Sequence, residues 1–322
     1  MNTNMQDREF CRKYHKEQVK YTVNAVSRRV IKSNIFEQHY DRKVLSEQDG
    51  NELLYQALVR EEAFMAGRFG GNEIRTISDV LFEKSGGRLG GLSARTRYKI
   101  TNQAGFFPDE IPLLYQFEEL YLECCKQVDV LGTWNMFLQA EIAKRYLPKT
   151  QLCELRTMEP FYFTEPWSRA LAGKNVLVIH PFSESIQKQY ERREKIFENP
   201  QILPDFSLKT VKAVQTIAGR RDSRFSTWFE ALDSMFEEAI GKEFEIALIG
   251  CGAYGFPLAA KLKKAGKKVI HMGGALQLLF GIKGKRWDKH EFIAKLYNES
   301  WIRPSEAEMV RKANVVEGGC YW

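Results

Sequence analysis

The stretch from Phe244 to Trp287 constrains the fold of this chain more than any other. In it, the apolar run Ile246–Ile249 precedes a cluster of glycines, an amphipathic stretch follows, and Val269-Ile270 begins a second apolar run. Strand, glycine turn, helix and strand in this order predict a βαβ unit. We expect the turn to point free backbone N–H groups beyond the end of the first strand, where an anionic phosphate is the natural ligand.

Three of these glycines, Gly250, Gly252 and Gly255, match the G-x-G-x-x-G spacing of dinucleotide-binding proteins, in the strand–helix context that the motif requires. That motif also expects an Asp or Glu at the end of the next strand, where it binds a ribose hydroxyl. Here the strand ends in His271-Met272-Gly273-Gly274, without a carboxylate. We therefore expect a phosphate-bearing nucleotide and favour a nucleoside diphosphate over NAD. The alternative is that the glycines only allow tight packing of the helix on the strand.

The composition is that of a globular protein. The 322 residues suffice for one large α/β domain or two smaller ones, and 44% of them are hydrophobic and 12% aromatic. The net charge of +7 comes from Lys and Arg residues spread along the chain. This indicates a solvated basic face, or else a surface for anionic ligands or acidic lipid headgroups. Nucleic acid is not an expected partner, because the sequence contains no recognisable nucleic-acid-binding module.

The cysteines and histidines do not indicate a metal site. The six cysteines form no C-x-x-C pair and the five histidines are scattered, so we expect no structural zinc. The first residues, MNTNMQDREF, lack the apolar core of a signal peptide. No window reaches the roughly 18 apolar residues of a membrane span. We expect a reduced, cytoplasmic protein, with peripheral contact at the inner face of the membrane as an open alternative.

The chain is expected to have three parts: a helical N-terminal extension (1–50), an α/β domain (51–304) and a C-terminal tail docked on that domain (305–322). The turn signal Asp49-Gly50-Asn51 marks the first boundary. We expect the extension to be a helix that packs on the domain, rather than on a second copy of the protein, through an apolar stripe. The stripe consists of Val19, Val23, Val26, Val30, Ile31 and Ile35.

Strands and helices are expected to alternate along most of the chain, which is typical of a doubly wound, mostly parallel Rossmann-like sheet. Before the central unit, we expect strands around Phe64–Arg68, Val128–Trp134, Leu155–Tyr162, Asn175–Phe182 and Leu208–Thr216. The expected helices are Glu52–Glu62, Ile77–Glu83, Ala94–Thr101, Ile111–Gln127, Ala140–Tyr146, Ile186–Phe197 and Phe229–Ile240.

The segment Phe64–Glu73 reads as a short strand that ends in a glycine-rich loop, with Arg68 at its start and Glu73 after Gly70. Such a loop brings backbone groups, a cation and a carboxylate close together. This combination suits a sugar phosphate, with Arg68 on the phosphate oxygens and Glu73 on sugar hydroxyls, a metal or a proton. The alternative is an ordinary tight turn with a surface ion pair.

Other polar residues are expected at the same edge of the sheet. Glu159 and His180 follow two predicted strands, and ligands of open parallel sheets collect at the carboxyl ends of the strands. After the central unit, Lys283, Lys285 and Arg286 lie within seven residues. These cations could neutralise the charge of a leaving diphosphate. A solvated basic surface is an equal alternative.

Together, Gly67–Glu73, Val176–Phe182 and Leu248–Gly255 resemble the GT-D-type glycosyltransferase fold family, a Rossmann-like group formerly classed as a domain of unknown function. The resemblance covers roughly Asn51 to Pro304. Members are found among enzymes of bacterial surface-polysaccharide and glycoprotein glycosylation. The family carries an Arg-Phe-Gly-Asp-Gly-Glu-like loop whose Asp-x-Glu pair handles the donor or its metal.

Arg68 and Glu73 match that loop, whereas Gly71 replaces its Asp and Asn72 its second Gly. A metal site normally needs more than one carboxylate, so no metal ligands are assigned, and dependence on Mn²⁺ or Mg²⁺ stays open. The resemblance implies transfer of a sugar from a nucleotide diphosphate donor, with a UDP-sugar as the first candidate. The acceptor would be a hydroxyl of a glycan or a lipid-linked molecule.

The resemblance and the motifs assign three tasks. The glycine turn and the loop around Arg68 would hold the diphosphate. The three cations after the central unit would stabilise the charge of the diphosphate as it leaves. Glu73 would deprotonate the acceptor, with Glu159 or His180 as the second choice. The alternatives are a nicotinamide-dependent oxidoreductase or epimerase of sugar nucleotides, and a non-catalytic nucleotide-binding scaffold. Assembly as a homo-oligomer stays open. The residues concerned are Arg68, Gly70, Glu73, Glu159, His180, Gly250, Gly252, Gly255, Lys283, Lys285 and Arg286.

Overall fold

The structure is a computed structural model that describes residues 2–30, 36–310 and 318–322. Within these residues, eight strands form a single sheet in the order β1-β4-β3-β2-β8-β7-β5-β6, and all of the neighbouring strands are parallel. This confirms the doubly wound, Rossmann-like arrangement expected from the sequence. The strands are β1 (Val44–Leu45), β2 (Phe64–Arg68), β3 (Val130–Thr133), β4 (Gln151–Glu154), β5 (Asn175–His180), β6 (Ser207–Lys212), β7 (Ile246–Ile249) and β8 (Lys268–His271).

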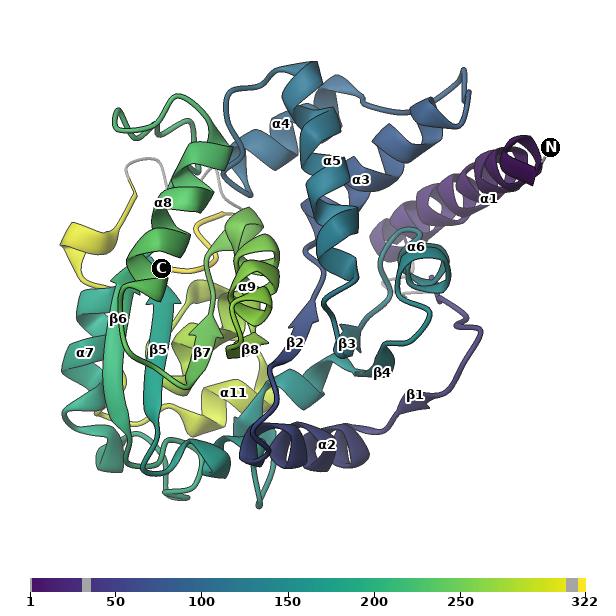
Figure 1. Ribbon diagram of the computed structural model, residues 1–322. Coiled ribbons are helices and arrows are strands. Elements are labelled where there is room, and N and C mark those ends of the chain that lie inside the picture. Colours follow the sequence, from purple (N-terminus) through teal and green to yellow (C-terminus); the bar gives the residue numbers. More distant parts are fainter. Residues whose placement is uncertain (1, 31–35, 311–317) are drawn as a thin grey trace.

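Helices cover both faces of this sheet (Figure 1). One face packs against α1, α3, α4, α5, α6, α8 and α9, and the other packs against α2, α7, α10 and α11. Their bounds are α1 (Asn2–Val30), α2 (Glu47–Val59), α3 (Gly71–Lys84), α4 (Ala94–Asn102), α5 (Ile111–Cys125), α6 (Gln139–Tyr146), α7 (Ser183–Tyr190), α8 (Trp228–Ile240), α9 (Gly255–Lys264), α10 (Leu276–Leu279) and α11 (Glu291–Leu296).

The central strands are apolar on both sides because both of their faces are covered. In β7, Ile246 and Leu248 belong to one apolar core, while Ala247 and Ile249 belong to the core on the opposite face. All four residues are fully buried. The alternation follows from the two-residue repeat of a strand, and it explains why β7 reads as an unbroken apolar run in the sequence.

The topology opens a crevice at the carboxyl ends of the central strands. The helix that follows β7 (α9) lies on one face of the sheet, whereas those that follow its neighbours β5 and β8 (α7 and α10) lie on the other. The connecting segments therefore diverge above β7, which is the usual position of a ligand site in an open α/β sheet. The arrowheads of β2 and β5 point upward in Figure 1, so their carboxyl ends lie toward the top of that view.

The central βαβ unit forms where the sequence predicts it. Strand β7 leads through a short 3₁₀ helix (Gly252–Tyr254) into α9, and β8 follows beside β7. Gly266 ends the helical segment with a positive φ of 82°, a conformation that favours glycine. The unit lies in the middle of the sheet, next to β2 and β5.

The turn predicted at Asp49–Asn51 is wrong, because these residues lie inside α2. Ser46 caps this helix, accepting a hydrogen bond from the Asp49 backbone N–H over 3.1 Å. Gly50 is needed for close packing, since a Cβ there would lie 2.6 Å from Oγ1 of Thr157. The side chain of Asn51 accepts a hydrogen bond from the Trp167 backbone N–H and is fully buried. Tertiary contacts thus outweigh the local turn signal, while the division into parts at residue 50 stays a prediction.

The apolar stripe predicted for the N-terminal helix is exposed rather than buried. Val19 and Val30 of α1 are 63% and 74% exposed, and Val23 and Val26 are similarly open. The helix instead packs through Phe10 and Tyr14, which bury larger aromatic surfaces and add a hydrogen bond from Tyr14 to Asp79. Ile31 and Ile35 of the predicted stripe lie outside the described residues.

Four further predicted segments differ from the structure. The helix predicted as Ile77–Glu83 begins at Gly71, so Gly71–Glu73, predicted as part of a loop, belongs to its first turn. Leu155–Tyr162 forms two 3₁₀ helices after β4 rather than a strand, and the helix predicted to reach Phe197 ends at Tyr190. The strand predicted as Leu208–Thr216 leaves the sheet after Lys212. Its last residues follow another path because the Thr216 hydroxyl donates to the Gly105 carbonyl over 2.5 Å. That path carries the segment across the crevice.

Candidate active site

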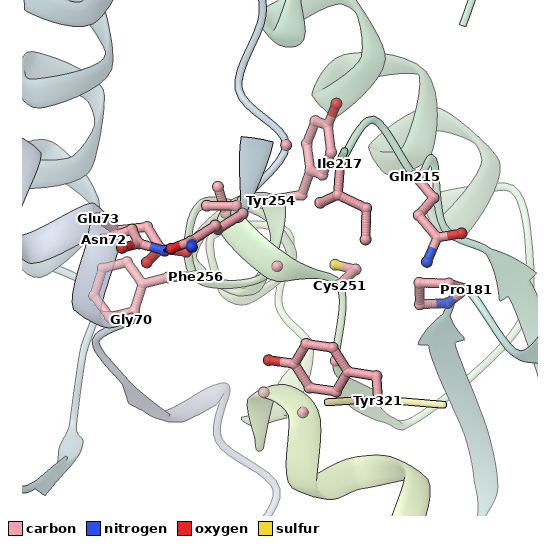
Figure 2. Close-up of a pocket in the computed structure, with 18 of the residues that line it drawn as sticks. Gly70, Asn72, Glu73, Pro181, Gln215, Ile217, Cys251, Tyr254, Phe256 and Tyr321 are labelled. Carbon is pink, nitrogen blue, oxygen red and sulfur yellow. The ribbon is translucent and has the colours of Figure 1, made fainter. Parts of the chain in front are cut away.

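A cavity of about 490 Å³ lies at the carboxyl ends of β2, β5, β7 and β8. This volume is within the range of small-molecule sites. Figure 2 shows it with Glu73 and Asn72 on one side, Pro181, Gln215 and Ile217 on the other, and Tyr321 below. The cavity therefore occupies the position that the sheet topology gives to a ligand.

The turn between β2 and α3 supplies the charged part of the wall. Arg68 is the last residue of β2, Gly70 is the N-cap of α3, and Glu73 lies in the first turn of that helix. All three line the cavity, as the sequence predicts. Glu73 is the one carboxylate among the described residues that line it. The guanidinium of Arg68 lies over the ring of Trp134, 4.5 Å from its centre.

Gly70 makes room for the carboxylate of Glu73. A Cβ at position 70 would lie 2.0 Å from Oε2 of Glu73, although a φ of −83° and a ψ of 150° suit any residue. We predict that Gly70→Ala changes the free energy of unfolding by less than about 1 kcal/mol, because the flexible carboxylate yields. Any reaction in which this carboxylate takes part should slow about tenfold, because the carboxylate is displaced.

Thermal unfolding and steady-state kinetics of the same preparation check this. Gly132→Ala is the matched control, since a Cβ there would lie 3.3 Å from Cγ of Met158, and neither residue is among the lining residues. A Gly70→Ala protein that keeps the wild-type reaction rate would show that the position of the Glu73 carboxylate does not matter.

Two guanidinium groups, those of Arg68 and Arg286, line the same cavity. Burial lowers the pKa of Arg68, and the neighbouring Arg286 acts in the same direction. Tyr321, Glu159 and Glu73 oppose this shift. Arginine keeps its charge in proteins, so the cavity presents two fixed cations that suit phosphate oxygens.

The glycine turn lies at the cavity, but much of it serves packing. Gly250 and Gly252 line the cavity and Gly255 does not. A Cβ on Gly250 would lie 2.5 Å from the Gly273 carbonyl oxygen, and one on Gly255 would lie 2.4 Å from Nε2 of His271. These glycines are therefore needed for close contact between elements, as in the packing alternative considered above.

Two backbone amides of the turn are already bonded within the protein. Gly250 N–H donates to the Ile179 carbonyl over 3.0 Å, and Ala253 N–H donates to the Ala104 carbonyl over 3.1 Å. The expectation that this turn presents free amides is wrong at these two positions. Gly250 continues the hydrogen bonding between β5 and β7, and at Ala253 the loop that contains Ala104 packs directly on the turn.

His180 and His271 line the cavity as neutral side chains. Burial lowers the pKa of each to about 3, and Arg68 acts in the same direction on His271. Nδ1 of His180 accepts a hydrogen bond from the Phe182 backbone N–H over 3.0 Å, so the neutral ring carries its proton on Nε2. His180 is therefore suited to donate a hydrogen bond, and it is a poor general base.

Four of the predicted site residues do not line the cavity: Glu159, Gly255, Lys283 and Lys285. Glu159 follows β4 near Arg68, and burial raises its pKa to about 7. The amino group of Lys283 lies 5.2 Å from the centre of the Tyr297 ring, and that of Lys285 donates to the Gly318 carbonyl over 3.3 Å. The Lys283 backbone N–H donates to the Ile302 carbonyl over 2.7 Å.

The sequence did not identify several residues of the wall. Trp134 stacks on Arg68, and the amide nitrogen of Gln277 donates to three backbone carbonyls, including that of Tyr321. Tyr321 reaches the cavity from the far end of the chain. Its neighbours in sequence are aromatic and small residues, which predicted a docked segment but no ligand contact.

The protein side chains do not form a complete metal site by themselves. In the described part of the chain, no three His, Cys, Asp or Glu side chains come together as metal ligands. Glu73 supplies a single carboxylate, and Mg²⁺ commonly binds through one or two carboxylates together with substrate phosphates and water. Dependence on Mn²⁺ or Mg²⁺ therefore stays open, and we assign no step to a metal.

Of the helices that the structure describes, none has the length and apolar content of a membrane span.

No protein-family model and no curated protein sequence matches this chain. Among solved structures, it is similar to one described as "The highly conserved domain of unknown function 1792 has a distinct glycosyltransferase fold". The two chains are 11% identical and superpose with a TM-score of 0.44 over 83% of this chain and 92% of that chain.

Proposed function

We propose that this protein is a glycosyltransferase that uses a nucleoside diphosphate sugar, with a UDP-sugar as the first candidate. The observation that supports this most is the lining of one cavity by two guanidinium groups and a single carboxylate, those of Arg68, Arg286 and Glu73. Two fixed cations suit a diphosphate, and a carboxylate beside them suits the acceptor hydroxyl. The cavity lies where α/β proteins bind nucleotides.

In this proposal, the oxygen of the acceptor hydroxyl forms a bond to C1 of the sugar. The carboxylate of Glu73 accepts the proton that this hydroxyl loses. The bond between C1 and the diphosphate oxygen breaks, and its electron pair leaves with the nucleoside diphosphate. Arg68 and Arg286 stabilise the negative charge that develops on that leaving group. His180 donates a hydrogen bond from Nε2 to an oxygen of the donor.

A nicotinamide cofactor is less well supported. The fingerprint for NAD places a carboxylate at the end of the second strand of the βαβ unit, which is β8 here. This strand ends at His271, whose neutral ring lines the cavity. A glycan or lipid-linked acceptor and a setting in bacterial surface-polysaccharide or glycoprotein synthesis rest on the sequence resemblance and are part of the proposal.

The proposal predicts that the purified protein binds UDP more tightly than uridine, and that Arg68→Ala weakens UDP binding by a factor on the order of 10². Uridine binding should stay the same, because uridine carries no phosphate. Arg68→Lys should recover part of the lost UDP affinity, since lysine keeps the positive charge but cannot bind phosphate oxygens in the bidentate way of arginine. Isothermal titration calorimetry with UDP, UDP-sugars, NADH and uridine measures these affinities.

Arg169→Ala is the matched control. Arg169 also lies over an aromatic ring, 3.6 Å from the centre of Tyr55, but it is not among the lining residues. Its replacement should leave UDP binding unchanged. Tighter binding of NADH than of any nucleotide sugar would support the oxidoreductase alternative instead. Nucleotide binding without sugar transfer to any supplied acceptor would support the alternative of a non-catalytic, nucleotide-binding scaffold protein.

A further inference from the structure

The segment Gly318–Trp322, here called the C-terminal segment, contacts Arg286. The backbone N–H of Arg286 donates to the Cys320 carbonyl over 3.0 Å, and its Nη2 lies 3.2 Å from Sγ of Cys320. The guanidinium carbon lies 4.9 Å from the centre of the Tyr321 ring. One side of this guanidinium therefore rests on the C-terminal segment, and Arg286 also lines the cavity.

The C-terminal segment is itself held in place. The side-chain amide of Gln277 donates to the Tyr321 carbonyl over 3.1 Å, and Lys285 N–H donates to the Trp322 carbonyl over the same distance. The Trp322 side chain is buried and packs edge-on against Phe182. These contacts give the Tyr321 ring a defined position at the cavity.

Tyr321 lines the same cavity as the two guanidinium groups of the site, those of Arg68 and Arg286. In the view of Figure 2 the ring lies below Cys251 and Tyr254. Gly274 allows this approach, because a Cβ there would lie 2.4 Å from Cε1 of Tyr321.

We propose that Tyr321 is a positioning residue for phosphate recognition: its ring orients the Arg286 guanidinium toward the diphosphate of the donor. This inference rests on the proposed function, which it deepens by assigning the C-terminal segment to the diphosphate subsite. The face of a tyrosine ring attracts a guanidinium and fixes the plane of that group. The arginine side chain therefore loses less conformational freedom when it binds the diphosphate. The hydroxyl group is not required for this role.

The test measures the ratio of the Kd of uridine to the Kd of UDP, which reports on recognition of the two phosphates alone. In Tyr321→Leu, which removes the ring, the ratio should fall about tenfold while uridine binding is retained. In Tyr321→Phe, which keeps the ring, it should stay within about twofold of wild type. Gly274→Ala, which displaces the ring without replacing it, should lower the ratio in the same direction and provides a second variant if Tyr321→Leu does not fold.

Tyr297→Leu is the matched control, since Tyr297 also carries a cation over its ring, that of Lys283, but is not among the lining residues. The ratio should not change in this variant. Arg286→Ala combined with Tyr321→Leu should lower it no further than Arg286→Ala alone, because the ring acts through that arginine.

The proposal is overturned if Tyr321→Leu keeps the wild-type ratio, if it weakens uridine and UDP equally, or if the double variant shows additive losses. In each of these cases the wild-type protein still prefers UDP to uridine, so the proposed function stands and only the role of Tyr321 is lost. A wild-type protein that binds the two equally well removes both proposals.

Discussion

Replacing Glu73 by Gln should lower the rate of sugar transfer by a factor of about 10² to 10⁴, the usual contribution of a general base. Gln has nearly the same shape but cannot accept the proton of the acceptor hydroxyl. UDP binding should change little, because the phosphates are assigned to Arg68 and Arg286. The measurement is kcat with a UDP-sugar and an acceptor, together with the Kd of UDP by calorimetry.

Glu141→Gln provides the control for this variant. Glu141, like Glu73, is buried in the first turn of a helix, and it pairs with Arg145 instead of lining the cavity. Its replacement should leave kcat unchanged. Full turnover in Glu73→Gln would remove Glu73 from the mechanism, whereas loss of turnover together with loss of UDP binding would indicate a structural role.

Acid should destabilise this protein strongly because His180 and His271 are buried as neutral rings. An unfolded histidine takes up a proton near pH 6.5, whereas these two do so at about pH 3 in the folded state. Between these values the unfolded state binds more protons, so the free energy of unfolding falls as the pH falls. Each ring contributes roughly 1 kcal/mol per pH unit, and the pair can remove much of a typical domain's stability by pH 4.

Buried acids act in the opposite direction over part of this range. Burial raises the pKa of Glu159 to about 7, so this carboxyl takes up its proton at a higher pH in the folded state than in the unfolded state. The stability that this adds is present at low pH and is lost as the pH rises toward 7. Burial also raises the pKa values of Asp79 and Glu118. The net decline should therefore be steepest at the acid end of the range, where the carboxyl groups are protonated in both states.

Urea unfolding at several pH values between 6.5 and 4 isolates the histidine contribution. His271→Gln should flatten the dependence of the unfolding free energy on pH by roughly 1 kcal/mol per unit, since it removes one of the two groups. Ile270→Val, at the adjacent position in β8, should lower stability without changing that slope. A His271→Gln protein with the wild-type slope would show that this ring does not remain neutral in the folded state.

The fold was predictable where local pattern and tertiary packing agree. The apolar run Ile246–Ile249, the glycine turn and the amphipathic helix specify a buried parallel strand and its crossover without further information. At Asp49–Asn51 the two disagree, because a turn signal lies inside a capped and buried helix. The outward valines of α1 show the same conflict, since the larger aromatic surfaces of Phe10 and Tyr14 decide which face is buried.

The sequence by itself determined a doubly wound parallel sheet and placed Arg68, Gly70 and Glu73 in one turn, because strand periodicity and a glycine-rich loop act over short distances. Only the tertiary structure decided which distant groups join them. It brought Arg286 and Tyr321 to the cavity and directed Lys283 and Lys285 elsewhere, through backbone hydrogen bonds to Ile302 and Trp322. Arg286 and Tyr321 lie more than 200 positions after Arg68 and outside the strands of the sheet, and they meet because backbone hydrogen bonds join the segments around them, such as that from Arg286 N–H to the Cys320 carbonyl. Local sequence patterns do not encode such contacts.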